Sequence, residues 1–126
     1  MNKIPVIKDS QNELAIPSAW RPVLVKIVDA LVEMDYRFHR TIDGLMPVSE
    51  QTTQHIQRYI KDYGETLVPL PEESWQTSIY IWMGTFWEVY VDLWTLKEGR
   101  SDLVVSVRVF ETSNVYNFEI HMVYVP

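Results

Sequence analysis

The first third of the chain carries apolar residues spaced three and four positions apart, with polar residues between them. This spacing places the apolar residues along one side of a helix and predicts a helix over 18–36. Pro22 fits the first turn, where its missing N–H has no partner to lose. The members of the stripe are Trp20, Leu24, Ile27, Val28, Leu31 and Met34. Such an aliphatic stripe is typical of a core-packing face. Residues 1–16 show no period, and we expect a loose lead-in.

A second helix is predicted over 50–63. Ser49 precedes it as a good N-cap, and Gly64 follows it where a left-handed residue would end it. The apolar line of this helix is narrow and consists of Ile56, Tyr59, Ile60 and Tyr63. Its other positions are polar, so we expect it to lie on the surface. Residues 37–48 are expected to connect the two helices.

After Pro71 the helical spacing gives way to the two-residue repeat of strands. Apolar and aromatic residues dominate four stretches, which predict strands at 74–83, 86–94, 103–111 and 115–125. A segment at 66–71 reads as an extended sheet edge or a loop. We therefore predict a single α+β domain over 1–126, with a helical part at 17–64 and a sheet part at 65–126. Two N-terminal helices would pack on one face of a four-stranded antiparallel β-meander, or of a five-stranded one.

The facing of the strands follows from the charges, because charged side chains face water and a purely apolar set faces the helices. A two-residue loop at 113–114 sets the register of the last hairpin. The pairs that it predicts are Thr112–Val115, Val109–Phe118, Arg108–Glu119, Val107–Ile120 and Ser106–His121. In the preceding hairpin, Leu93 opposite Leu103 brings Glu88 beside Arg108. Opposite charges across neighbouring strands favour these registers.

The outer face of this sheet is expected to mix carboxylates with large aromatic rings. Its predicted members are Glu88, Asp92, Glu119, Arg108, His121, Tyr90, Phe86 and Trp94. Even positions of the last strand, among them Met122 and Tyr124, are expected to face the helices. Tyr80 and Trp82 join the outer face if the first hairpin has a three-residue loop at 83–85. Aromatic anchors among polar side chains are typical of protein interfaces.

Charge divides the chain near its middle. Residues 1–64 hold eight acidic and eight basic side chains, whereas residues 65–126 hold nine and three, so the second half carries the whole formal charge of −6. An acidic chain without a basic surface is not expected to bind nucleic acid. The longest uncharged stretch, 74–87, has only fourteen residues, so no membrane partner is expected either.

The absence of cysteine excludes disulfides, thiolate metal sites and cysteine nucleophiles. It also fits a reducing compartment, and residues 1–16 lack the pattern of a signal peptide, so we expect a soluble cytoplasmic protein. The sequence has no metal-site signature, no glycine-rich phosphate loop and no nucleophile elbow. We therefore predict no enzymatic activity, no metal and no cofactor.

Three histidines are the remaining candidates for chemistry. His39 is interpreted as a loop or cap residue, and His55 as an exposed side chain of the second helix. His121 lies beside Glu119 and is predicted opposite Ser106. We interpret it as a structural or interface residue rather than a general base.

Several motifs in the second half carry a resemblance to a known family. They are Trp75 with the runs 82–87, 99–104, 108–111 and 120–126. On these motifs, the chain after the lead-in resembles a family of small uncharacterised bacterial proteins. That resemblance implies no activity and no site residues. In its size, acidity and general build the chain is also similar to immunity proteins of contact-dependent inhibition and related toxin systems.

We expect a non-enzymatic interaction protein, most concretely an immunity protein that binds a toxin domain and blocks it. Toxin domains that act on nucleic acid are often basic, so an acidic partner gains steering and specificity from its charge. The residues expected to contact the partner are Glu88, Asp92, Glu119, His121, Tyr90, Trp94 and Trp82. Two alternatives stay open. One is a small-ligand or weakly enzymatic domain with a pocket lined by His121, Glu119 or His55, and the other is a self-associating structural protein.

Overall fold

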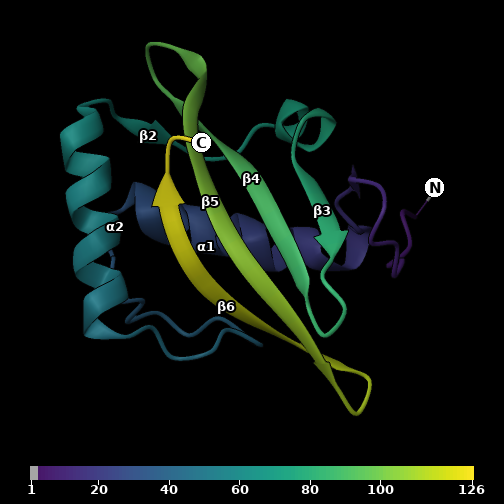
Figure 1. Ribbon diagram of the computed structural model, residues 1–126. Helices are drawn as coiled ribbons and strands as arrows, with labels where there is room; N and C mark the ends of the chain where they lie inside the picture. The colour runs from purple at the N-terminus through teal and green to yellow at the C-terminus, as the bar shows by residue number, and fades with distance from the viewer. Residues whose placement is uncertain (1–2) are drawn as a thin grey trace.

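The computed structural model describes residues 3–126. Within this part of the chain, the α-helices are α1 (Arg21–Val32) and α2 (Glu50–Tyr63), and the short 3-10 helices are η1 (Ser18–Trp20) and η2 (Glu72–Gln76). The strands are β1 (Leu14–Ala15), β2 (Leu67–Val68), β3 (Ile79–Trp82), β4 (Trp87–Thr95), β5 (Gly99–Thr112) and β6 (Val115–Tyr124). Figure 1 shows α1 crossing behind the sheet and α2 standing along β6. Neither helix of the described residues is long and apolar enough to cross a bilayer.

The sheet is larger than the sequence predicts. Its strands pair antiparallel in the order β1-β3-β4-β5-β6, and β2 pairs with the far end of β4. The predicted architecture, two N-terminal helices on a four- or five-stranded meander, is therefore wrong. The described residues form six strands, and β1 precedes both helices. Strands β1 and β2 have only two residues each, which is too short for an alternating pattern to show in the sequence.

Helix α1 lies against one face of the sheet and ends before the predicted 18–36 does. The chain leaves the helix because Met34 takes a left-handed φ of 60°. The N–H of Asp35 donates to the carbonyl of Ala30 at 2.9 Å. The N–H of Met34 donates to the carbonyl of Leu31 at 3.1 Å, which completes a Schellman C-cap.

Helix α2 confirms the predicted bounds, 50–63. The Ser49 hydroxyl accepts the N–H of Thr52 at 3.1 Å, and Gly64 ends the helix with a φ of 82°. Its buried side chains are Thr53, Ile56 and Ile60. Because these contact the region of β6, α2 covers the edge of the sheet rather than its face (Figure 1).

The segment before α1 is part of the core and not a loose lead-in. Trp20 is fully buried, and its ring meets the rings of Tyr80, Trp87, Tyr116 and Phe118 edge-on at 5.2 to 6.3 Å between centroids. The backbone of Ile7 is held from both sides. Its N–H donates to the Tyr80 hydroxyl at 2.8 Å, and its carbonyl accepts the indole N–H of Trp87 at 3.0 Å. The residues before η1 mix charged and apolar side chains without a regular spacing, so the sequence does not predict this packing.

The hairpin of β3 and β4 turns Tyr80 and Trp82 toward the helices. Trp82 lies opposite Trp87, so the loop has four residues, 83–86, and not three. Tyr80 lies opposite Val89 and is 1% exposed. The condition for these two rings to join the outer face is therefore not met.

The last hairpin confirms four of its five predicted pairs and carries one irregularity. Ser113 and Asn114 form the two-residue loop with φ values of 50° and 64°. The predicted pair of Ser106 with His121 is wrong, because β6 bulges there and Ser106 lies opposite Met122 instead. Beyond this bulge the parity of β6 reverses, so Met122 and Tyr124 face outward while Val123 is buried.

Two buried serines complete the sheet at the gap between β3 and β2, on the edge of β4 that faces away from β5. Strand β3 pairs with β4 only as far as Tyr90, and β2 pairs with it from Trp94. Between them, the N–H of Asp92 donates to Ser78 Oγ at 3.1 Å, and Ser74 Oγ donates to the carbonyl of Asp92 at 3.2 Å. The two hydroxyls thus take the place of a strand's backbone groups.

We expect Ser78→Ala to lower the free energy of unfolding by about 1–3 kcal/mol, because it leaves the buried N–H of Asp92 without an acceptor. The neighbouring exposed Thr77→Ala is the matched control and should change it by less than about 0.5 kcal/mol. Urea unfolding followed by tryptophan fluorescence measures both. Equal effects of the two substitutions would contradict this role for Ser78.

Candidate binding face

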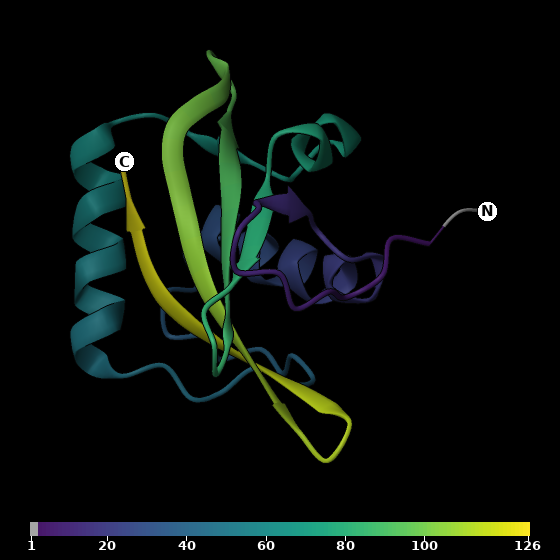
Figure 2. The same ribbon diagram turned by 45° about the vertical axis from the view of Figure 1, so that its right-hand side comes forward.

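One face of the sheet has no helix over it. In Figures 1 and 2, α1 lies behind the strands and α2 lies beyond β6, which leaves the front of β4, β5 and β6 open. We call this surface the outer face. Register and burial assign to it Phe86 just before β4, Glu88, Tyr90 and Asp92 on β4, Val104, Ser106, Arg108 and Phe110 on β5, and Asn117, Glu119, His121, Met122 and Tyr124 on β6.

The centre of the outer face is a chain of hydrogen bonds around Glu88, which is only 6% exposed although no helix covers it. Its carboxylate accepts Ser106 Oγ at 2.7 Å and Arg108 Nε at 3.2 Å. The guanidinium of Arg108 also reaches His121 Nε2 at 3.3 Å. Because a guanidinium can only donate, His121 accepts at Nε2 and carries its proton on Nδ1.

This network confirms the placement of Arg108 between Glu88 and Glu119 across the strands. It also changes what the face presents. The Glu88 carboxylate forms an ion pair with Arg108 and accepts a hydrogen bond from Ser106, so its charge is balanced within the protein. The acids left at the rim are Asp92 and Glu119, and Glu13 lies near Tyr90. Burial raises the pKa of Tyr90, and the negative charges of Glu88 and Glu13 raise it further.

Around the network lie half-buried apolar and aromatic side chains. The ring of Phe86 lies 5.5 Å from that of Phe110 and 5.1 Å from the guanidinium carbon of Arg108. Tyr90 and the post-bulge residues Met122 and Tyr124 extend this apolar frame. Sequence reasoning missed Met122 and Tyr124, because no local pattern marks a bulge and alternation alone sends both residues to the helix side.

Five of the seven predicted contact residues come together on the outer face: Glu88, Tyr90, Asp92, Glu119 and His121. Trp94 alternates to the same side of β4 as Tyr90 and Asp92 but lies at the far end of the strand, where its ring packs over Gly99 and its indole nitrogen is buried without a hydrogen-bond partner among the described residues. Trp82 lies on the other face, with its ring 4.7 Å from that of Trp87 and 5.1 Å from Lys8 Nζ. It is partly buried against the core and is not part of the outer face.

A hollow of about 210 Å³ lies between α2 and β6, and it is lined by Gln51, Thr52, His55, His121 and Met122. His55 is half-buried there rather than exposed, and its Nε2 lies 3.1 Å from the carbonyl of Val123. Two histidines thus meet where the small-ligand alternative expects them, but Glu119 is not part of the lining. The volume is below the roughly 300–1,000 Å³ of ordinary ligand pockets.

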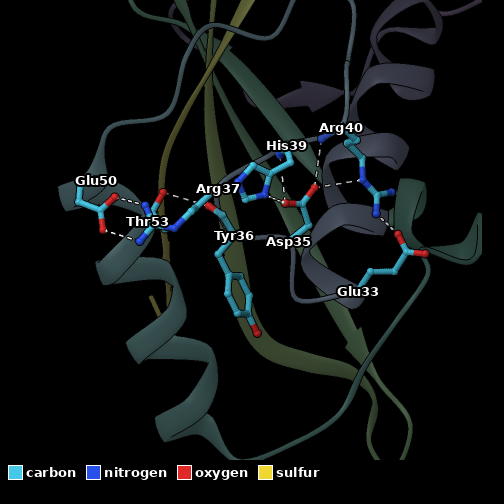
Figure 3. Close-up of polar contacts among 8 residues, drawn as sticks. All are labelled: Glu33, Asp35, Tyr36, Arg37, His39, Arg40, Glu50 and Thr53. Carbon is cyan, nitrogen blue, oxygen red and sulfur yellow. Dashed lines mark hydrogen bonds and ion pairs between the residues drawn. The ribbon is translucent and has the colours of Figure 1, made fainter.

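His39 belongs to a network of paired charges after α1 (Figure 3). The carboxylate of Asp35 accepts the backbone N–H groups of His39 and Arg40 at 3.0 and 3.3 Å, and its Oδ1 lies 3.2 Å from His39 Nδ1. The bond from the His39 backbone is the main reason that the pKa of Asp35 is lowered. Arg40 also pairs with Glu33, and Arg37 pairs with Glu50 across to α2. The His39 side chain is 79% exposed, as a loop residue is expected to be.

The described residues therefore combine an open sheet face with a satisfied ion network, and they contain no group of three or more His, Cys, Asp or Glu placed to hold a metal ion. Residues 28–126 match the model of a domain of unknown function, DUF7668, and the chain belongs to that family. No curated protein and no solved structure matches the chain.

Removing Arg108 should destabilise the fold, because Glu88 would stay buried without its cation. We expect Arg108→Met to lower the free energy of unfolding by about 1–3 kcal/mol. The double variant Glu88→Gln/Arg108→Met should recover part of this loss, since a neutral amide still accepts from Ser106. Arg58→Met, on the exposed side of α2, is the control. Urea unfolding of wild type, Glu88→Gln, Arg108→Met and the double variant gives the coupling energy, and strictly additive losses would refute it.

The lowered pKa of Asp35 predicts a pH dependence of stability. A carboxyl group whose pKa is lower in the folded state stabilises the protein above its unfolded pKa of about 3.9 and loses this effect as the pH falls through the folded value. Wild type should therefore melt higher than Asp35→Asn near neutral pH, and the difference should shrink below about pH 4. Thermal unfolding from neutral to acidic pH tests this. If the difference in melting temperature between wild type and Asp35→Asn stayed constant with pH, the predicted contribution of the Asp35 charge would be wrong.

Proposed function

We propose that this protein is a non-enzymatic binding module that takes a basic protein partner on its outer face. In its most concrete form, it is an immunity protein that neutralises a bacterial toxin domain. The observation that carries the proposal is the uncovered outer face, on which half-buried aromatic rings surround the fixed network of Glu88 and Arg108.

The composition of the outer face supports a protein partner. Tyr, Phe, Met and Arg are the residue types enriched at the centres of protein interfaces. Here Tyr90, Phe110, Met122 and Tyr124 are half-buried before any partner binds, so their rotamers are already restricted. An aromatic side chain held in this way costs little entropy on binding and anchors contact area.

The charges of the outer face favour a basic partner over a second copy of the chain. Its lone cation, Arg108, is already bound to Glu88, while Asp92 and Glu119 pair with no base among the described residues. Self-association would bring these acids together and lose energy by repulsion. A partner with an apolar centre and lysines or arginines at its rim would instead be steered toward the face.

The immunity role follows from the same charge argument. A toxin domain that cleaves or modifies nucleic acid needs a basic surface to hold phosphates. An acidic protein that covers this surface blocks the substrate without any chemistry of its own. The outer face itself carries Glu88, Asp92 and Glu119 against Arg108, and the acidic excess of residues 65–126 adds to this field.

The test is a binding assay with the product of the adjacent reading frame, expressed as an inactive variant. We expect a complex that weakens with added salt, because rim charges contribute mainly to association. Asp92→Asn/Glu119→Gln should slow association, whereas Tyr90→Ala should speed dissociation and weaken affinity at least about tenfold. Asp43→Asn, in the connection before α2, is the control. Absence of a complex, together with no protection of cells on co-expression, would reject the immunity role.

A further inference from the structure

A second hollow lies at the C-terminal end of α2, away from the outer-face network. Its volume is about 420 Å³, and it is lined by Tyr59, Asp62 and Tyr63. These positions follow the i, i+3, i+4 spacing that places side chains on one side of a helix. The volume lies within the roughly 300–1,000 Å³ of small-molecule sites.

Tyr63 is a fixed wall of this hollow. Its hydroxyl donates to Glu98 Oε2 at 2.9 Å and accepts the backbone N–H of Asp102 at 3.2 Å. Both partners come from the hairpin of β4 and β5, so the ring is tied to the sheet as well as to α2. Tyr59 is 37% exposed, and its ring lies 5.3 Å from that of His55.

The electrostatics of the hollow are negative. Asp62 lines it, and Glu98 and Asp102 lie close enough to Tyr63 for both of their charges to act on it. Burial raises the pKa of Tyr63, and these two carboxylates raise it further, so the phenol stays neutral. Two aromatic rings and the Asp62 carboxylate therefore line the hollow, and Glu98 and Asp102 add negative charge beside the Tyr63 hydroxyl.

We propose that this hollow binds an organic ammonium ion between Tyr59 and Tyr63, with Asp62 as its counter-ion. Aromatic faces attract cations through the ring quadrupole, most effectively when the cation is weakly hydrated. A hard metal ion would instead need several oxygen ligands converging on one point. The rings also offer apolar surface to methyl or methylene groups, which a metal ion lacks.

The ammonium group has two possible sources: a free quaternary ammonium compound, or the side chain of a lysine in a peptide. Both present the same chemistry to the two rings. The proposal does not depend on the outer face, because none of its residues belongs to that surface. A chain that binds an ammonium ion but no basic protein would support this site and reject the function proposed above.

The experiment compares choline with its uncharged isostere 3,3-dimethylbutan-1-ol. Both are titrated into the full chain at constant ionic strength, and the tyrosine ring signals are followed by NMR. We expect saturable shifts at Tyr59 and Tyr63 with choline, at millimolar affinity, and at least about tenfold weaker binding of the isostere. Equal affinities would overturn the proposal, as would the absence of saturable shifts with choline.

Variants test the two kinds of wall separately. Tyr59→Leu keeps apolar bulk but removes the aromatic face and should weaken choline about 2- to 30-fold. Asp62→Asn removes the counter-ion and should also weaken it, whereas Asp43→Asn, far along the chain, should not. If Tyr59→Leu binds choline as wild type does, the site is wrong.

A final arm assigns the source of the ammonium group. A short peptide with one trimethylated lysine is compared with the same peptide carrying unmodified lysine and with one carrying norleucine. Competition with choline by either lysine peptide supports a side chain as the ligand, and competition by neither supports a free compound. Norleucine competing as well as the lysine peptides would contradict cation recognition.

Discussion

The packing of one tryptophan under the sheet determines how the other elements are arranged. Trp20 is fully buried and touches rings from β3, β4 and β6, so a residue that precedes α1 joins strands distant in the sequence. Large aromatic rings contribute more buried area than any other side chain, which makes this cluster the main anchor of the N-terminal segment. Trp20 lies outside the family match, which begins at residue 28 within α1. Residues before the matched region, Ile16 and Trp20 among them, therefore form part of the core.

The location of this cluster explains why the outer face is open. Trp20 and α1 together fill the space on one side of the sheet, so α2 finds no room there. It packs instead along β6, where Ile56 is buried and His55 approaches the carbonyl of Val123 at 3.1 Å. That position protects the edge strand from pairing with another chain. The opposite side of β4, β5 and β6 is then left to its own side chains, and Glu88 is buried by its neighbours alone.

Local signals predicted α2 and the last hairpin from the sequence, because a serine cap, a glycine stop and a two-residue loop each act over a few residues. They also placed Arg108 between Glu88 and Glu119, at the centre of the outer face. The bulge at His121, the two-residue strands and the four-residue loop after Trp82 were not predictable. The two-residue strands depend on pairing between segments far apart in the chain, such as Leu14 with Tyr80, and no local residue pattern marks the bulge or the loop length. Because the length of this loop could not be predicted, Trp82 was assigned to the wrong face of the sheet.

The bulge in β6 determines which large side chains the outer face carries at its β6 end. With regular alternation, Met122 and Tyr124 would face the helices and Val123 would lie on the outer face. With one extra residue, both side chains turn outward and His121 meets Arg108. Glu88 then has all of its partners within the protein, so its burial does not oppose docking. The outer face therefore has a satisfied ion network at its centre, half-buried apolar side chains around it, and Asp92 and Glu119 at its rim. A second place where aromatic rings and a carboxylate lie together is the hollow lined by Tyr59, Asp62 and Tyr63.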